Sequence, residues 1–479
     1  MNARKNALYN VAYRVFSILL PLVTSPYLSR VCGQTGVGLY SFAWSVSYLF
    51  CLLGMLGLEN YGVRAIAQVR HDTRELDRVF TEVYCMQLLV AGAALLGYLG
   101  YACFLAGAEK TIALHLTMMS VSCMVNLDWC LMGLEQFKPI ALRNTAVKLL
   151  ATMCVFLFVH SAEDLWIYAL VWSLATLLGC VSCALSLRGR VRLVRVRARS
   201  VLRHLPPCAV LCVSVLAVNV FRTMDKVMVG ALSSMEQNGL YANAEKIVYC
   251  LSGFISAIGT VMLPRASALL RRGKRDAVLE QMDVSMQAVL CMVCALSFGL
   301  ASISEMFAPL FFGAQFVFSG QLMVPLSFTL VAIGFANVIR TQWILPQERD
   351  GIFVRSVLCG AAVNLLLNIL LIPRFGSAGA VPGTLLAECA VPLTQYVFLR
   401  GELPYRRYLR YLLQYSLIGG VMLLFVQLIG PVAGSGWLGA GIRVGLGALL
   451  YAALCLAMWK ATGNRAMLRL LRPIRKKTV

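Results

Sequence analysis

Long runs of apolar residues, separated by short polar connections, follow one another along the whole chain. A transmembrane helix needs about 20 mostly apolar residues, and about 14 runs reach that length. They cover residues 7–31, 36–59, 81–106, 113–134, 140–160, 165–187, 205–231, 239–263, 282–305, 321–345, 352–373, 376–399, 411–431 and 436–459. Because the connections are short, the pattern predicts an all-α polytopic membrane protein with no sizeable domain outside the membrane.

The composition supports this prediction. Hydrophobic residues make up 59% of the 479 residues and charged residues 13%, and the mean hydropathy is +0.76. Soluble domains have about 45–50% apolar and about 25% charged residues, so a soluble, a disordered or a disulfide-rich secreted protein is excluded. Most of the 17 cysteines lie inside apolar runs, where cysteine packs as a small apolar side chain.

Positive charge alternates between successive connections. Lys and Arg gather at the N-terminus, at 60–80, 135–143, 188–204, 264–281, 346–351 and 400–410, and in the tail from Lys460. The intervening loops contain only Lys110 and Arg374, or Arg30 as well if the first outer loop begins there. Cytoplasmic loops carry an excess of Lys and Arg, so we expect both termini in the cytoplasm.

The net charge of +22 and the Arg-rich stretch 188–204 also raise the question of nucleic-acid binding. In a chain this apolar, a basic connection is better explained by anionic lipid headgroups at the membrane surface. We therefore predict a basic cytoplasmic linker and no nucleic-acid partner.

The two halves of the chain repeat each other weakly. The segment Gly36–Ser41 after the first span resembles Asn238–Ala242 after the seventh. Six spans separate the copies, so both would insert with the same orientation, as parallel repeats for alternating access require. The predicted domains are an N-lobe at 1–187, the linker 188–204, a C-lobe at 205–400, and two further helices with a basic tail at 401–479.

Cationic side chains interrupt several apolar runs, most densely in the seventh. Asn219, Arg222 and Lys226 are spaced so that they share one helix face. An ionised side chain near the bilayer centre costs at least about 2.5–3.5 kcal/mol, so it usually faces a cavity or a partner. Guanidinium groups match phosphate geometry. The candidate substrate-binding cations are Arg14, Arg30, Arg222, Lys226 and Arg340.

Acidic residues within the spans are candidates for ion coupling or for counter-ions. They are Asp128, Asp225, Glu245 and Glu388. Asp225 lies next to Lys226 and near Arg222, so the cations of the seventh span are alternatively explained by an internal ion-pair cluster. Glu245 likewise precedes a lysine, whereas both roles stay open for Asp128 and Glu388. The candidate energy sources are a proton or sodium gradient and the membrane potential.

Several kinds of chemistry have no support in the sequence. The chain has no G-x-x-x-x-G-K-[ST] loop, so it does not hydrolyse ATP through that motif. Two C-x-x-C strings lie inside apolar runs, and the four histidines are far apart, so no metal site, catalytic constellation or cofactor is predicted. A transporter is favoured over an enzyme.

Short motifs throughout residues 6–400 resemble a known family. In the first half they are Pro26-Tyr27-Leu28-Ser29-Arg30-Val31, Gly38-Leu39-Tyr40, Gly57-Leu58-Glu59-Asn60-Tyr61-Gly62 with Arg64, and Asp128-Trp129 before Gly133-Leu134-Glu135. In the second half they are Asp225-Lys226 with Met228 and Gly230, Asn243-Ala244-Glu245-Lys246, Asn364, Asn368, Ile372-Pro373, Gly376, Gly379-Ala380, Thr384 and Ala387-Glu388. Their order resembles the polysaccharide transporter family, the Wzx-type oligosaccharide flippases.

This resemblance implies the fold of the multidrug/oligosaccharidyl-lipid/polysaccharide exporters, with two six-helix lobes in a V around a central cavity. It also implies transfer of a polyprenyl-diphosphate-linked glycan, in bacteria an undecaprenyl-diphosphate-linked one, from the inner to the outer leaflet of the cytoplasmic membrane. Polysaccharide polymerase machinery would be a partner. Arg64 matches the family's Gly-x-Arg and is a candidate entry or gating residue with Asn60 and Arg355, although a topology signal explains Arg64 equally well.

Three alternatives stay open. A lipid II flippase would share the helix number and a cationic cavity, but the quoted motifs resemble the polysaccharide branch more. A multidrug or cation antiporter would want a carboxylate-rich cavity, whereas Arg and Lys dominate here. A membrane oligosaccharide ligase or polymerase would need longer outer loops than this chain has.

Overall fold

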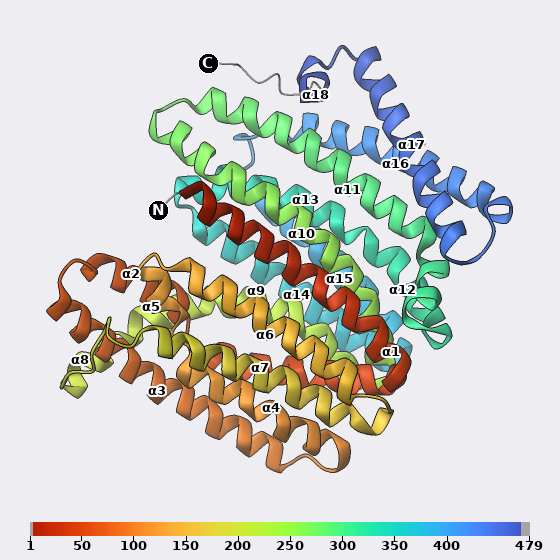
Figure 1. The fold of residues 1–479 in the computed structure, drawn as a ribbon. Coiled ribbons are helices and arrows are strands. Elements are labelled where there is room, and N and C mark those ends of the chain that lie inside the picture. The colour runs from red at the N-terminus through yellow and green to blue at the C-terminus, as the bar shows by residue number, and fades with distance from the viewer. Residues whose placement is uncertain (1–2, 471–479) are drawn as a thin grey trace. The chain divides into compact units, whose positions relative to one another are not determined.

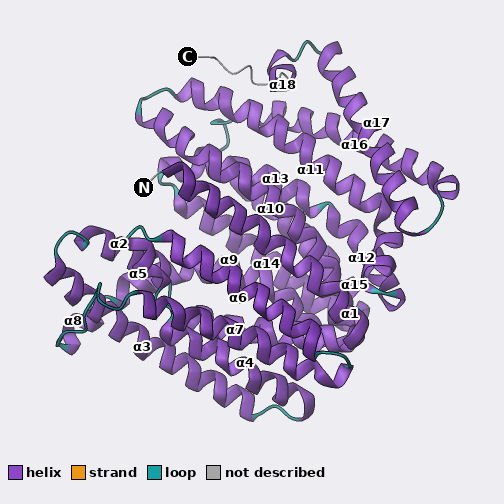
Figure 2. Ribbon diagram, in the orientation of Figure 1, coloured by secondary structure: helices purple, strands orange, loops and turns teal. Residues whose placement is uncertain are grey.

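The computed structural model describes residues 3–470, and every regular element within this range is a helix (Figures 1 and 2). The side chains of residues 1–21, 137–139, 141, 213, 214, 465 and 469–479 lie outside the description. The chain divides into two compact units, Met1–Gly239 and Leu240–Val479. The prediction of an all-α membrane protein is confirmed.

Unit 1 contains the first nine α-helices. They are α1 (Ala3–Met55), α2 (Leu58–Val69), α3 (Thr73–Cys103), α4 (Gly107–Val125), α5 (Asp128–Gly133), α6 (Phe137–Phe158), α7 (Leu165–Ser186), α8 (Ala198–Leu202) and α9 (Leu205–Leu232), with the 3₁₀ turn η1 (Ala162–Asp164). Helix α10 (Met235–Arg271) begins at the end of unit 1 and continues into unit 2.

Unit 2 contains the remaining helices. They are α11 (Arg275–Phe312), η2 (Ala314–Phe316), α12 (Val317–Ser327), α13 (Thr329–Ile339), the π-helix η3 (Arg340–Ile344), η4 (Leu345–Gln347), α14 (Asp350–Phe375), α15 (Ser377–Phe398), α16 (Tyr405–Ala433), α17 (Gly436–Ala461) and α18 (Arg465–Leu470). The two predicted extra helices, α16 and α17, pack against each other and against α11.

Helices lie in all of the predicted spans, but their boundaries differ from the prediction. Helix α1 runs through the first two predicted spans and is interrupted only at Gly33, whose φ of 68° is left-handed. Helix α2 occupies part of the predicted loop 60–80. In the described part of the chain 10 helices, or up to 11 with one bent pair, are long and apolar enough to cross a membrane. The number 14 stays a prediction.

One end of unit 1 is built around the indole of Trp129, which is fully buried in α5. Its Nε1 donates to Gln87 Oε1 at 2.9 Å. A Cβ on Gly62 would lie 2.6 Å from the indole ring, so only glycine lets α2 approach α5 this closely. Two of the short sequence motifs therefore meet here as packing partners.

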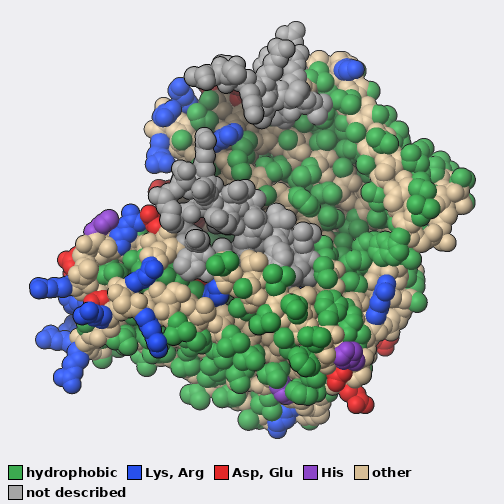
Figure 3. All heavy atoms as spheres, viewed as in Figure 1, with side chains coloured by type: hydrophobic (Ala, Val, Ile, Leu, Met, Phe, Trp, Pro, Cys, Tyr) green, Lys and Arg blue, Asp and Glu red, His purple; other side chains and the backbone are tan. Residues whose placement is uncertain are grey.

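A buried carboxylate anchors the basic linker to the same end of unit 1. The side chain of Glu82 on α3 is 1% exposed and accepts from Arg78 Nε at 3.1 Å and from Arg203 at 2.8 Å. His204 Nε2 lies 3.1 Å from Glu82 Oε2, and His204 Nδ1 lies 2.6 Å from the hydroxyl of Tyr61. In Figure 3, Lys and Arg side chains gather over this end of unit 1, around α8.

The linker backbone is also bound to the start of α3. The amide of Arg192 donates to Asp77 Oδ1 at 2.7 Å, and the amide of Val194 donates to Thr81 Oγ1 at 3.1 Å. These backbone hydrogen bonds hold the 188–204 segment along α3. The linker is therefore fixed by its backbone as well as by the ion pairs of its basic side chains.

The two repeat motifs meet within unit 1. A Cβ on Gly38 of α1 would overlap the carbonyl oxygen of Met235, and one on Gly239 would overlap that of Gln34. The side-chain amide of Asn238 donates to the backbone carbonyl of Gly38 at 2.8 Å in a fully buried contact. The glycines that suggested the repeat are thus needed for the close approach of two backbones.

We predict that Glu82→Ala releases the linker. Removing the buried carboxylate takes away the acceptor that holds Arg203 and His204 at the end of the linker, so trypsin should cut within 188–204 at least about tenfold faster. Glu75→Ala, which removes an exposed glutamate from the same helix, is the matched control. Equal cleavage rates for both variants would show that Glu82 does not anchor the linker.

Gly38→Ala should lower stability by about 2 kcal/mol, because a methyl group forced into a close backbone contact overpacks it. Gly92→Ala on α3 is the matched control, since nothing lies within 4 Å of its added Cβ. This control should be neutral or gain about 0.5–1 kcal/mol of stability. Thermal unfolding in detergent measures both, and equal midpoints would refute the close-packing argument.

Candidate functional site

Helix α9 carries the densest set of predicted site residues. Arg222 is exposed and Lys226 is half-buried, whereas Asp225 between them is buried. The hydroxyl of Thr223 donates to the backbone carbonyl of Asn219 at 2.9 Å. The side-chain amide of Asn219 donates to the backbone carbonyl of Val215 at 2.8 Å. Two cations one turn apart are therefore displayed on a helix that is otherwise largely apolar.

The same helix borders a polar pocket in unit 1 of about 240 Å³. Its polar lining comes from α1, α2, the end of α4, α7 and α9, through Tyr48, Glu59, Asn60, Asn126, Thr176 and Asn219. The hydroxyl of Tyr48 donates to Asn219 Oδ1 at 3.1 Å. Tyr48 is also within electrostatic range of Arg222, so this cation of α9 lies near the pocket.

A break between α1 and α2 places the first turn of α2 at this pocket. Leu56 and Gly57 have φ values of 41° and 70°, so two consecutive residues are left-handed. Such a conformation is uncommon for leucine and persists only where its surroundings enforce it. A Cβ on Gly57 would lie 2.8 Å from the amide nitrogen of Cys212, so the break packs against α9. Glu59 and Asn60 follow directly.

Asp128, one of the candidate coupling residues, forms an ion pair within unit 1. Arg143 donates to its two carboxylate oxygens at 2.9 and 3.0 Å. The Arg143 and Asp128 side chains are 8% and 18% exposed, and the thiol of Cys183 donates to Asp128 at 2.8 Å. A bidentate, largely buried pair of this kind is the arrangement of a counter-ion.

In unit 2, Arg340 is the first residue of the π-helix η3. Its guanidinium carbon lies 5.1 Å from the centre of the Phe353 ring, within the range of a cation–π contact. Arg355 is exposed and stacks over Phe398 at 5.4 Å. π-Helical turns inside α-helices occur often at functional sites, so the geometry keeps Arg340 a candidate.

The remaining predicted site residues are dispersed. Arg30 and Arg64 are exposed in unit 1, and in unit 2 Glu245 is buried and Glu388 half-buried. Arg14 lies outside the described side chains. Of the predicted site residues in unit 1, Arg222 and Lys226 therefore lie together on α9. Asn60 lies at the polar pocket near Arg222.

Sequence reasoning missed acidic residues near the ends of predicted spans. Glu59 and Glu82 are described above. Asp283 accepts from the hydroxyl of Tyr411 at 3.1 Å and from Arg407 at 3.4 Å. All three lie inside the predicted ranges, so a search of those ranges for every carboxylate would have found them.

A further carboxylate, Glu402, connects helices in the loop after α15. Arg349 donates to it at 2.7 and 2.8 Å, and Trp343 Nε1 donates at 3.0 Å. Burial raises the pKa of Glu402, but the hydrogen bonds from Arg349 and Trp343 outweigh it and hold that pKa below its usual value. Glu402 is therefore ionised at neutral pH and binds the start of α14.

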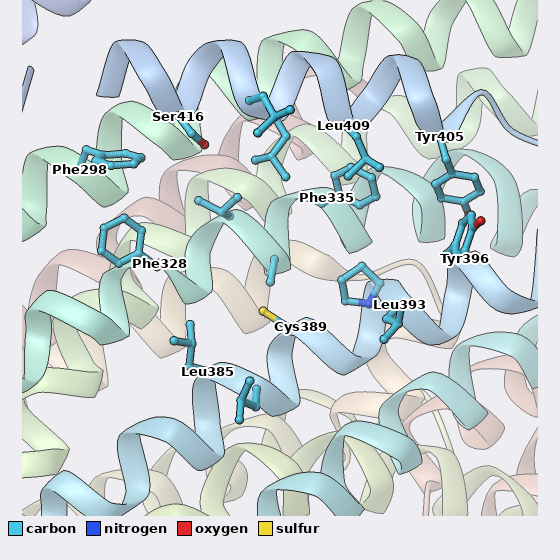
Figure 4. Close-up of a pocket in the computed structure, with 16 residues that line it drawn as sticks. Phe298, Phe328, Phe335, Leu385, Cys389, Leu393, Tyr396, Tyr405, Leu409 and Ser416 are labelled. Carbon is cyan, nitrogen blue, oxygen red and sulfur yellow. The ribbon is translucent and has the colours of Figure 1, made fainter. Parts of the chain in front are cut away.

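Unit 2 also contains an apolar pocket of about 760 Å³ between α11, α13, α15 and α16 (Figure 4). Phe298, Phe335 and Leu393 are among its lining residues. Tyr396 and Tyr405 lie at one end of the group, with ring centres 4.8 Å apart. The lining contains no Lys, Arg, Asp or Glu, so the pocket suits a hydrocarbon chain rather than a charged group.

The fold is similar to that of solved membrane transporters. An inward-closed structure of the lipid II flippase MurJ matches with a TM-score of 0.76 and 14% identity, over 96% of this chain and all of that one. An inward-facing multidrug resistance MATE family transporter of the MOP superfamily matches with a TM-score of 0.54 and 13% identity, over 80% of this chain and 98% of that one. At such identities the likeness shows the fold alone.

Sequence comparison identifies the family. A protein of Escherichia coli (strain K12) named "Putative O-antigen transporter" is 22% identical over 84% of this chain and 98% of its own length. The "Probable low-salt glycan biosynthesis flippase Agl15" of Haloferax volcanii is 21% identical over 34% of each chain. The family model described as "Polysaccharide biosynthesis protein" matches residues 3–270. Since that match covers more than half of the chain, this protein belongs to the polysaccharide biosynthesis protein family.

Proposed function

We propose that this chain is a flippase for an undecaprenyl-diphosphate-linked oligosaccharide, a repeat unit of O-antigen, capsule or exopolysaccharide. It would move this lipid from the inner to the outer leaflet of the bacterial cytoplasmic membrane by alternating access, without catalysing a reaction. Membership of the family and the names of the two relatives support a lipid-linked glycan as cargo. The observation that carries the proposal is the pair of cations displayed on α9.

The diphosphate is the part of such a lipid whose negative charge most needs groups of opposite charge. Its charge cannot cross a hydrocarbon core unless groups of opposite charge replace its water. Arg222 offers a guanidinium that donates to two phosphate oxygens at once, and Lys226 adds a point charge one turn further along α9. Arg14, Arg30 and Arg340 are further candidate headgroup-binding cations, and Asn60, Arg64 and Arg355 are the proposed entry or gating residues.

The polyprenyl chain needs an apolar surface throughout the transfer. The pocket of unit 2 offers one, and each CH₂ group buried from water stabilises the bound lipid by about 0.8 kcal/mol. Figure 4 shows Leu385 and Leu393 of α15 facing the side of α16 that carries Leu409. We propose that this pocket holds part of the polyprenyl chain.

The proposal also covers the orientation of the chain in the membrane and the energy source for transport. Both termini and the 188–204 linker would lie in the cytoplasm, against anionic lipid. A proton or sodium gradient, or the membrane potential, would drive net transfer, with Glu245 and Glu388 as the candidate coupling residues because Asp128 is occupied by Arg143. Asp225 remains a candidate counter-ion for Lys226.

The similarity of the fold to MurJ supports a second candidate, a lipid II flippase. Lipid II also carries a diphosphate, so the cations of α9 would serve either cargo. The two are separated by supplying one polyprenyl diphosphate with a neutral oligosaccharide and another with a sugar–peptide headgroup. Preferential transfer of the peptide-bearing lipid would favour the second candidate.

Arg222→Ala and Lys226→Ala should each slow transfer of a polyprenyl-diphosphate oligosaccharide in proteoliposomes by at least about tenfold, because a hydrogen bond to a charged group is worth about 1.5–3 kcal/mol. Outward appearance is measured with a membrane-impermeant sugar-modifying reagent. Arg188→Ala in the linker is the control and should transfer at the parent rate. Unchanged transfer in both α9 variants, with normal insertion, would remove these cations from the site.

A cation placed in the apolar pocket should block the polyprenyl chain. Leu413→Arg puts a charge into the lining of the pocket, whereas Leu417→Arg puts the same charge one turn away on α16, outside it. We expect Leu413→Arg to slow transfer about tenfold and Leu417→Arg to slow it much less, since charge in an apolar site is costly. Equal effects would indicate that the pocket does not hold the chain.

A further inference from the structure

The polar pocket of unit 1 combines groups that suit a sugar ring. Amides, hydroxyls and one carboxylate line it together with the apolar side chains of Leu52, Met55 and Met119. Sugar hydroxyls need both donors and acceptors, and the C–H faces of the ring need apolar contact. At about 240 Å³ the pocket is smaller than the 300–1,000 Å³ typical of drug-sized ligands, so its size suits a single monosaccharide.

Glu59 and Asn60 are the polar groups most available for a ligand. Both side chains are exposed at the pocket, and neither makes a hydrogen bond or ion pair with another residue of the described chain. Asp128 lies within electrostatic range of Glu59, but it has the same sign and is already paired with Arg143. An uncompensated carboxylate in a membrane-embedded unit is costly unless a ligand or water satisfies it.

The remaining polar groups are held in fixed positions. The ring of Tyr48 stacks on Trp44, with centres 5.0 Å apart and planes 7° from parallel. Asn126 accepts from the amide of Asp128 at 3.1 Å, so its side-chain NH₂ donors stay available within the described structure. Preorganised donors and acceptors of this kind lose little entropy on binding.

The pocket also lies next to the proposed phosphate site. Asn219, which accepts from Tyr48, precedes Arg222 by three residues on α9. At 1.5 Å of rise per residue, the two side chains start about 4.5 Å apart along the helix, and Lys226 follows about 6 Å further on. A sugar in the pocket would therefore be adjacent to a diphosphate bound by these cations.

We infer that this pocket is a saccharide subsite for the first sugar of the glycan, the one joined to the diphosphate. This inference rests on the proposed function and adds a determinant of specificity to it. Glu59 accepts hydrogen bonds from two ring substituents, Asn60 and Asn126 donate and accept beside it, and Tyr48 closes the side towards Arg222.

The charge of Glu59 decides which sugars fit. Like charges placed together are strongly unfavourable, so a hexuronic acid is rejected at this position. A neutral or amino-substituted sugar is accepted. Selection at the first sugar thus works by repulsion as well as by attraction, as specific sites commonly do.

The experiment compares two lipids that differ only at this sugar: polyprenyl diphosphate carrying one N-acetylglucosamine, and the same lipid carrying one glucuronic acid. In proteoliposomes the parent should transfer the first at least about tenfold faster. Glu59→Gln should narrow this ratio several-fold, chiefly by raising transfer of the glucuronic acid lipid. Glu163→Gln, which changes an exposed glutamate in η1 of the same unit, should keep the parent ratio.

Asn60→Ala provides a second reading that does not depend on charge. It should slow transfer of the N-acetylglucosamine lipid several-fold more than transfer of bare polyprenyl diphosphate, because only the first lipid carries the sugar that Asn60 would contact. If Glu59→Gln leaves the ratio of the two transfer rates unchanged, the subsite is overturned. An unchanged ratio in which both lipids are transferred more slowly would make Glu59 an ion-coupling or structural group. If the parent moves none of these lipids, the proposed function fails and the subsite fails with it.

Discussion

The hydrocarbon core of a bilayer offers no water to an ionised side chain, so each charge within the apolar helices needs a partner, a cavity or a position near a helix end. In unit 1, Asp128 is matched by Arg143, and Glu82 is matched by Arg78, Arg203 and His204. Against this background, Arg222 and Lys226 of α9, one exposed and one half-buried, and the exposed carboxylate of Glu59 are the groups that the proposed substrate would contact. The two cations belong to the proposed diphosphate site, and Glu59 belongs to the proposed saccharide subsite.

Most of the fold could be predicted from the spacing of apolar runs, because a helix satisfies its own backbone hydrogen bonds in lipid. The boundaries could not. Gly33 interrupts α1 without ending it, and the left-handed residues Leu56 and Gly57 end that helix where no polar loop marks the break. The number of membrane crossings depends on where such helix breaks lie, and the pattern of apolar residues does not predict the positions of these breaks.

The candidate site could be predicted only where its residues share one helix. Arg222 and Lys226 were found from their spacing on α9. The pocket beside them was not, because Tyr48 and Asn219 are 171 residues apart and meet only through tertiary packing. His204 illustrates the same limit, since four histidines scattered along the sequence gave no metal spacing, yet this one contacts Glu82, 122 residues away.

The central claim is that α9 presents one continuous site, with cations for a diphosphate and a pocket for the sugar joined to it. An experimental map of the protein in lipid nanodiscs, with polyprenyl diphosphate N-acetylglucosamine bound, tests it most directly. The account predicts diphosphate density against Arg222 and Lys226, with the sugar extending towards Asn219 and Glu59. Headgroup density elsewhere in the molecule, with this pocket filled only by water, would contradict it.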